Sequence, residues 1–143
     1  MKLRLLLAAL SLSLAASPFV RAAGEDETQL GKEMSAMNKA FRQLKKQAAD
    51  ATQNAASAEL VAQVKKNAEA SIELIPEKAA GLPEAERAAF AENYKKEMKA
   101  FVGVLGKLEA AFKAGDNEAA GKLIAEIGAL QKAGHKEFRK PKE

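Results

Sequence analysis

Residues 30–48 read LGKEMSAMNKAFRQLKKQA, and the spacing of the apolar side chains in this stretch decides the fold. They follow one another at intervals of four and three residues, which is typical of one face of a helix in a bundle and not of a strand. The positions are Leu30, Met34, Met37, Phe41, Leu44 and Ala48. We therefore predict an amphipathic helix from about Asp26, its N-cap, to Ala49.

Three further segments repeat this helical spacing. The second spans residues 57–76, the third 83–115 and the fourth 116–138. In the second segment we expect Ser57 to be the N-cap and Ile75 to be the last core residue. The first and second segments are joined by a short connection, as are the third and fourth, so neighbouring helices should be antiparallel. The expected fold class is all-α, an antiparallel up-down-up-down four-helix bundle.

The N-terminal residues 1–22 have the pattern of a secretory signal peptide. A basic start precedes an apolar stretch, and a small-x-Ala cleavage motif ends at Ala22. The apolar stretch is too short to remain in a bilayer as a spanning helix. We expect cleavage to leave residues 23–143 as one domain in the periplasm, a monomer with no membrane anchor.

Composition excludes several kinds of site. The chain has 23 Lys and Arg against 19 Asp and Glu, but three of these cations lie in residues 1–22, so the remainder is nearly neutral and not suited to nucleic acid. It contains no cysteine. This excludes thiolate zinc sites, iron–sulfur clusters, cysteine nucleophiles and covalent Cys-x-x-Cys-His haem attachment.

The single histidine of the chain, His135, lies near the end of the fourth segment, whereas Met34 lies near the start of the first. In an antiparallel four-helix bundle these two ends share a pole. Met34 lies roughly 12 Å along its helix at ~1.5 Å per residue, and His135 lies a similar or smaller distance from its helix end. Met and His together are an axial ligand pair of electron-carrying haem.

Each residue alone also has a simpler explanation. A methionine at such a position often fills a gap in a core, and a histidine in the last turn of a helix often interacts with the helix dipole. Met37, one turn deeper on the same stripe, is a rival iron ligand, and Met98 is a third candidate.

Two stretches carry a family resemblance, LGKEM at residues 30–34 and AGHKEFR at residues 133–139. They resemble the soluble cytochrome b562 family of periplasmic haem-binding four-helix bundles. The resemblance implies one non-covalent haem b, iron protoporphyrin IX, with Met34 and His135 as iron ligands. The further residues that we assign to the haem pocket are Phe41, Tyr94, Met98, Phe101, Gln131, Phe138 and Arg139.

The chain departs from the family pattern at four of its positions. Gln131 stands where the family commonly has arginine, and Gly134 stands where it has an aromatic residue. Tyr94 and Met98 replace two phenylalanines against the haem. These changes predict a haem that is held more loosely or is more exposed.

If two side chains fill both axial positions, no site for oxygen or substrate remains, so we expect an electron carrier and not an enzyme. The rival hypothesis is a haem-free periplasmic protein, either a helical chaperone or a copper-binding protein that uses Met and His. Residues 132–142 are rich in Lys and Arg. They could interact with the dipole of the last helix, form a docking patch for an unidentified acidic redox partner in the periplasm, or do both.

Overall fold

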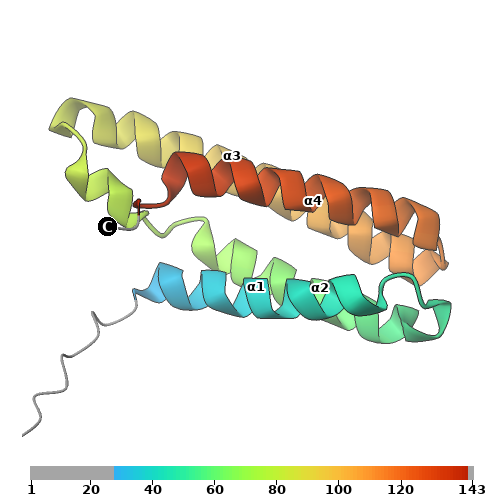
Figure 1. Ribbon diagram of the computed structural model, residues 1–143. Coiled ribbons are helices and arrows are strands. Elements are labelled where there is room, and N and C mark those ends of the chain that lie inside the picture. The colour runs from blue at the N-terminus through green and yellow to red at the C-terminus, as the bar shows by residue number, and fades with distance from the viewer. Residues whose placement is uncertain (1–27, 142–143) are drawn as a thin grey trace, which may run out of the picture.

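The computed structural model describes residues 28–141, and over that range it consists of four α-helices and two short 3-10 helices. The elements are α1 Gln29–Gln47, η1 Ala51–Gln53, α2 Asn54–Ser71, η2 Glu77–Gly81, α3 Glu84–Ala114 and α4 Asn117–Phe138. Consecutive helices run antiparallel, with α2 packed between α1 and α3, and α4 packed on α3 (Figure 1). The predicted all-α, up-down-up-down bundle is confirmed.

Side-chain caps and one glycine set the helix ends. The Thr28 hydroxyl accepts a hydrogen bond from the Gly31 backbone N–H at 3.1 Å, so Thr28 is the N-cap of α1. The expected cap Asp26 lies outside the described residues, as do residues 1–22. Gly115 ends α3 with a φ of 75°, a conformation that glycine adopts without strain. The Asp116 carboxylate then caps α4 by accepting the Ala119 N–H at 2.9 Å.

The limits of α2 differ from the prediction. The helix already begins at Asn54, because the Asp50 side chain caps the short η1 and the chain continues from it into α2. Ser57 is therefore not a cap but a buried residue whose hydroxyl accepts a hydrogen bond from Gln47 at 3.1 Å. The helix ends at Ser71, before Pro76, so helical spacing no longer applies to Ile75, which is 66% exposed and not in the core.

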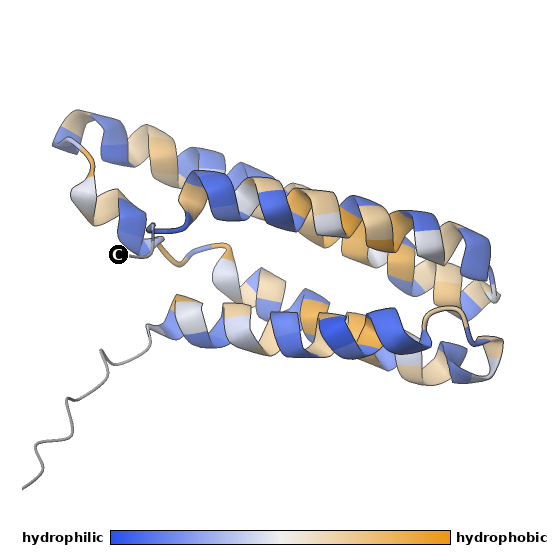
Figure 2. Ribbon diagram, in the orientation of Figure 1, coloured by the Kyte–Doolittle hydropathy of each residue, from blue (hydrophilic) through white to orange (hydrophobic). Residues whose placement is uncertain are grey.

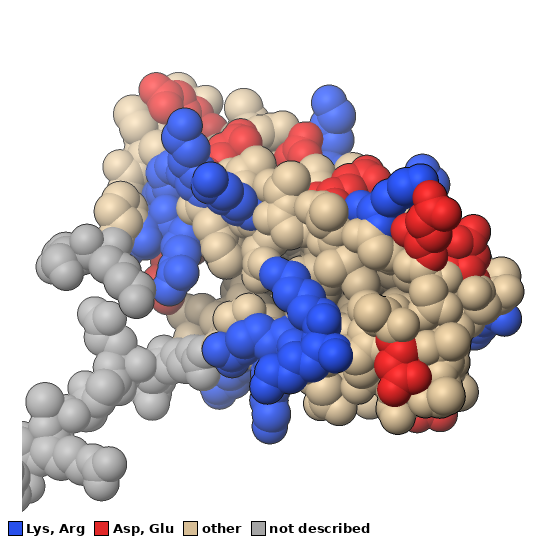
Figure 3. Space-filling view, turned by 45° about the vertical axis from the view of Figure 1, so that its right-hand side comes forward, with Lys and Arg blue, Asp and Glu red and all other residues tan. Residues whose placement is uncertain are grey.

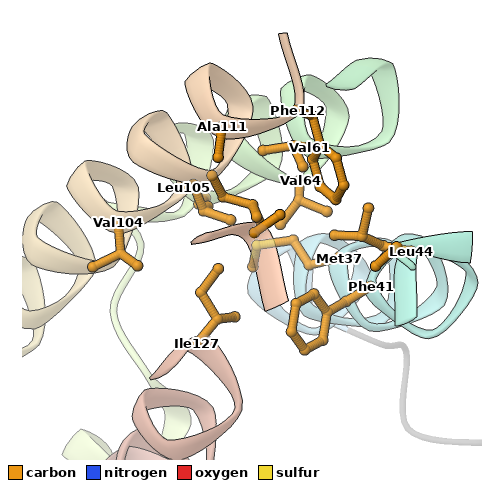
Figure 4. Packing of buried hydrophobic residues seen from close by; sticks show 14 of the residues in the cluster. Met37, Phe41, Leu44, Val61, Val64, Val104, Leu105, Ala111, Phe112 and Ile127 are labelled. Atoms are coloured by element: carbon orange, nitrogen blue, oxygen red, sulfur yellow. The ribbon is translucent and has the colours of Figure 1, made fainter. Parts of the chain in front are cut away.

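One continuous hydrophobic core runs between the four helices. Hydrophobic and hydrophilic residues lie on different faces of the helices (Figure 2). Met37, Phe41 and Ile127 point into the same interior space (Figure 4). Leu44 and Leu105 are wholly buried, and each buried side chain of this size stabilises the fold by about 1.5–3 kcal/mol. Within residues 28–141, no helix combines the length and the apolar character needed to cross a membrane.

Candidate functional site

The start of α1 and the end of α4 lie at the same pole of the bundle (Figure 1). Met34 lies in the second turn of α1, where it is half-buried and packs against the edge of the core. His135 lies in the last turn of α4 and is exposed. The topology therefore brings the two predicted iron ligands to one end of the molecule on two different helices.

Contacts of the neighbouring residue Glu137 establish the direction in which His135 faces. Asn93 of α3 donates a hydrogen bond to the Glu137 carboxylate, and Lys78 of η2 donates one to its backbone carbonyl. This side of α4 therefore faces α3 and η2. His135 precedes Glu137 by two residues, about 200° around the helix, so it occupies the opposite flank of α4, away from α3 and η2.

A similar argument separates Met34 from Met37. Gln47 of α1 bonds to Ser57 of α2 and so marks the flank of α1 that faces α2. At about 100° per residue, Met37 lies roughly 80° from the direction of Gln47, and Met34 roughly 140° from it. Met37 is accordingly enclosed in the core at 6% exposure, whereas Met34 lies on the flank of the apolar stripe that is farther from α2.

The facing flanks of these two helices form what we call the α1–α4 seam. Within residues 28–141, α1 and α4 approach each other closely at few points, if any, in contrast to the three pairs of consecutive helices. Gly128 and Gly134 of α4 are half-buried, yet a Cβ atom added to either would meet no other atom within 4 Å. The bundle thus has room along α4 next to His135.

The surroundings of His135 favour its neutral form. Although its side chain is exposed, the protein atoms around it remove part of its hydration, and this desolvation lowers the pKa of the imidazole below 6.5. The positive charge of Arg139 acts in the same direction. A neutral imidazole has the free lone pair that metal coordination requires.

An aromatic cluster closes the core at the same pole. The Phe138 ring packs edge-on against Phe90 and Tyr94, with both pairs of ring centroids 5.3 Å apart. The Tyr94 hydroxyl donates to the Ser71 carbonyl at 3.1 Å, which joins α3 to the end of α2. Burial raises the pKa of Tyr94 to about 12, so this phenol is a neutral part of the wall.

The structure places the other predicted pocket residues at different depths. Met98 is buried, Phe101 and Gln131 are half-buried, and Arg139 is exposed at the end of α4. Phe41 is a core residue two turns along α1 from Met34, with the Lys45 ammonium 4.7 Å from its ring centroid. Of the predicted set, the structure shows direct ring contact for Tyr94 and Phe138.

Sequence reasoning did not anticipate Glu137 as the residue that fixes the end of α4. Its partners Asn93 and Lys78 precede it by 44 and 59 residues, so no helical spacing connects them. Phe90 lies within the third predicted helix, but its place in the aromatic cluster depends on the register between α3 and α4. Neither contact has a local signal in the sequence.

The family model of cytochrome b562 matches residues 29–139, from the first residue of α1 to the C-cap of α4. The chain belongs to the cytochrome b562 family. This is a family of haem-binding electron carriers, which agrees with the resemblance of residues 30–34 and 133–139. No curated protein and no solved structure matches the chain.

The residues at the pole fit a haem on three counts. A thioether and a neutral imidazole are donors that haem iron accepts, and they lie on two helices that are not consecutive and approach each other closely at few points. The glycines Gly128 and Gly134 leave space on the same helix as the imidazole. The aromatic cluster at the same pole is apolar, as the surroundings of a porphyrin face must be.

Proposed function

We propose that this cytochrome b562 family member is a periplasmic electron carrier that binds one haem b through Met34 and His135. The observation that carries the proposal is that the start of α1, which carries Met34, and the end of α4, which carries His135, lie at one pole of the bundle. The family match supports haem binding over the same residue range. The signal-like residues 1–22 support export.

In this proposal the bound haem iron supplies one-electron redox chemistry. The imidazole of His135 and the thioether of Met34 would hold the iron, and the soft thioether would favour the reduced state. Tyr94, Met98 and Phe138 are buried and would exclude water from the porphyrin. Arg139, one turn after His135, supplies a cation on the rim for a haem carboxylate.

The haem-free alternatives have less support. A helical chaperone needs an extended apolar surface, but in the described part of the chain Ile75 is the only large apolar residue that is exposed. Among residues 28–141, no three His, Cys, Asp or Glu side chains lie together where they could hold a metal ion. The copper alternative uses the same Met34 and His135 pair that we assign to haem.

An absorbance titration of the purified domain with haem tests the proposal. A one-to-one endpoint with sharp low-spin bands in the reduced state is the expected result. The control is the His135→Ala variant, titrated under the same conditions. If the unmodified protein shows no saturable uptake of haem, the proposal is wrong, and stoichiometric uptake of copper would then support the copper-binding alternative.

A further inference from the structure

The outward face of α1 carries a continuous row of positive charge. The core side chains Met37, Phe41 and Leu44 define the buried side of this helix. Lys32, Lys39 and Lys46 recur every seven residues on the opposite side and are all exposed. Figure 3 shows Lys and Arg side chains gathered over α1 on the lower part of the surface.

We call this surface the basic ridge and define it by the exposed cations Lys32, Lys39, Arg42, Lys45 and Lys46. The helix contains one acidic residue, Glu33. None of the ridge cations belongs to an ion pair found within residues 28–141, whereas Lys65, Lys95 and Lys122 elsewhere do pair with carboxylates. The charge of the ridge is therefore not neutralised within the described part of the molecule.

The end of α4 extends the ridge across the α1–α4 seam. The exposed cations there are Lys132, Lys136, Arg139 and Lys140, against the single acid Glu137, whose carboxylate is turned toward α3. Between residues 48 and 130 the chain instead has a small excess of acids over bases. Positive charge is thus concentrated on the two helices that carry Met34 and His135.

We infer that the basic ridge and the end of α4 together form the docking surface for an acidic electron-transfer protein. The inference rests on the proposed function, because docking here would place the partner beside the seam that holds the haem. Complementary charge accelerates encounter and orients it, and the nearly balanced remainder of the surface gives no comparable attraction. Charges exposed at such a rim act on the rate of association more than on affinity.

An acidic protein fits this surface better than a lipid bilayer does. A helix that lies in a membrane interface inserts an apolar face between the lipids. The apolar face of α1 is occupied by the core, with Phe41 and Leu44 both buried. Its outward face offers charge without apolar side chains for insertion, which suits a transient polar contact between two proteins.

The test compares two charge-reversal variants of the full domain. One variant, Lys39→Glu/Arg42→Glu/Lys46→Glu, alters the ridge. The matched control, Lys66→Glu/Lys96→Glu/Lys107→Glu, reverses three exposed cations of α2 and α3 and changes the net charge equally. The probe is an acidic blue-copper protein, whose Cu(II) accepts one electron from the reduced domain and becomes Cu(I).

For the unmodified domain we expect a second-order rate constant of electron transfer that falls with added salt. At low salt the rate constant of the ridge variant should be about tenfold lower than that of the unmodified domain, because an attraction has been turned into repulsion. The control variant should change the rate less than about threefold. Equal effects of the two variants, or no effect of the ridge variant, would overturn the inference.

Two further measurements separate this inference from the proposed function. Haem-free protein should bind fluorescent poly-L-glutamate through the ridge, and this binding is independent of haem. If the protein binds no haem but still binds poly-L-glutamate through the ridge, the proposed function is wrong, but the ridge remains a surface that binds polyanions. Vesicles containing phosphatidylglycerol provide the second measurement, and stronger ridge-dependent binding to them than to the acidic protein would overturn the choice of a protein partner.

Discussion

Asn54 and Asn117 form a reciprocal amide pair at the pole opposite the candidate site. Each side-chain Nδ2 donates to the Oδ1 of the other, at 3.0 and 2.8 Å, across 63 residues of sequence. The Asn117 amide also donates to the Ala48 carbonyl at 2.8 Å. These contacts join the end of α1 to the starts of α2 and α4. The pole far from Met34 and His135 is thus fixed by polar contacts between the helix ends.

We expect Asn117→Ala to destabilise the domain by about 2 kcal/mol, because it leaves several part-buried polar groups without their partner. Thermal unfolding of the haem-free protein measures the loss. Asn38→Ala, at an exposed position of α1, is the control and should change stability by less than about 0.5 kcal/mol. A double-mutant cycle with Asn54→Ala that shows no coupling would contradict a role for the amide pair.

Local patterns in the sequence were sufficient for the helices and their order. The four-three spacing from Leu30 to Ala48 predicted α1, and the predicted boundary between residues 115 and 116 coincides with the turn between α3 and α4. They failed at α2, where polar residues near Ser57 suggested a turn. Helical hydrogen bonding and the contact with Gln47 outweighed that preference.

The candidate site was predictable only in part. The common pole of Met34 and His135 follows from helix order alone, so the sequence could indicate it. The orientation of α4 depends on Glu137 bonding to Asn93 and Lys78, and such distant contacts leave no periodic signal. The roles of the ligands themselves remain predictions that the following variants address.

Gly134 and Gly115 should respond in opposite ways to alanine. A Cβ at Gly134 meets no atom within 4 Å, and the residue lies inside α4, so Gly134→Ala should stabilise the haem-free helix by up to about 1 kcal/mol. Gly115 has a φ of 75°, where a side chain is strained, so Gly115→Ala should destabilise the domain by about 1 kcal/mol. Thermal unfolding measures both. A destabilised Gly134→Ala protein would mean that the space beside His135 is not open.

Because the pKa of Tyr94 is raised by burial, we expect the domain to lose stability in alkaline solution. Burial raises its pKa from 10.0 to about 12 in the folded protein, so the unfolded chain loses the phenolic proton first. The stabilisation is fully present below pH 10 and declines as the pH rises to about 12. Because Tyr94 is the one tyrosine of the chain, its phenolate absorbance reports this titration directly.

The Tyr94→Phe variant is the matched control for this titration. It should lack the phenolate signal and lose less stability between pH 10 and 12 than the unmodified protein does. At neutral pH it should be destabilised by about 1 kcal/mol, since the hydrogen bond to the Ser71 carbonyl is lost. Titration of the unmodified protein near pH 10 would contradict the buried position of the phenol.

His135→Ala should abolish tight binding of haem, because it removes the only imidazole of the chain. The exposed position of His135 means that the haem-free variant should keep its fold and its unfolding temperature. The absorbance titration and a thermal unfolding curve measure these two properties. Haem uptake that is as tight as in the unmodified protein would transfer the ligand role to another side chain.

Two alanine variants distinguish Met34 from Met37 as the iron ligand, because we expect them to differ in the free energy of unfolding and in the absorbance spectrum of the bound haem. Met34→Ala should convert the bound haem to a five-coordinate, high-spin form, with a modest effect on stability because Met34 is half-buried. Met37→Ala should keep the low-spin spectrum but destabilise the domain by about 2–5 kcal/mol, since Met37 is enclosed in the core. If Met37 is the ligand, the two variants exchange their spectra, but Met37→Ala remains the less stable protein. A low-spin spectrum in both would assign the position to Met98, which is buried in α3.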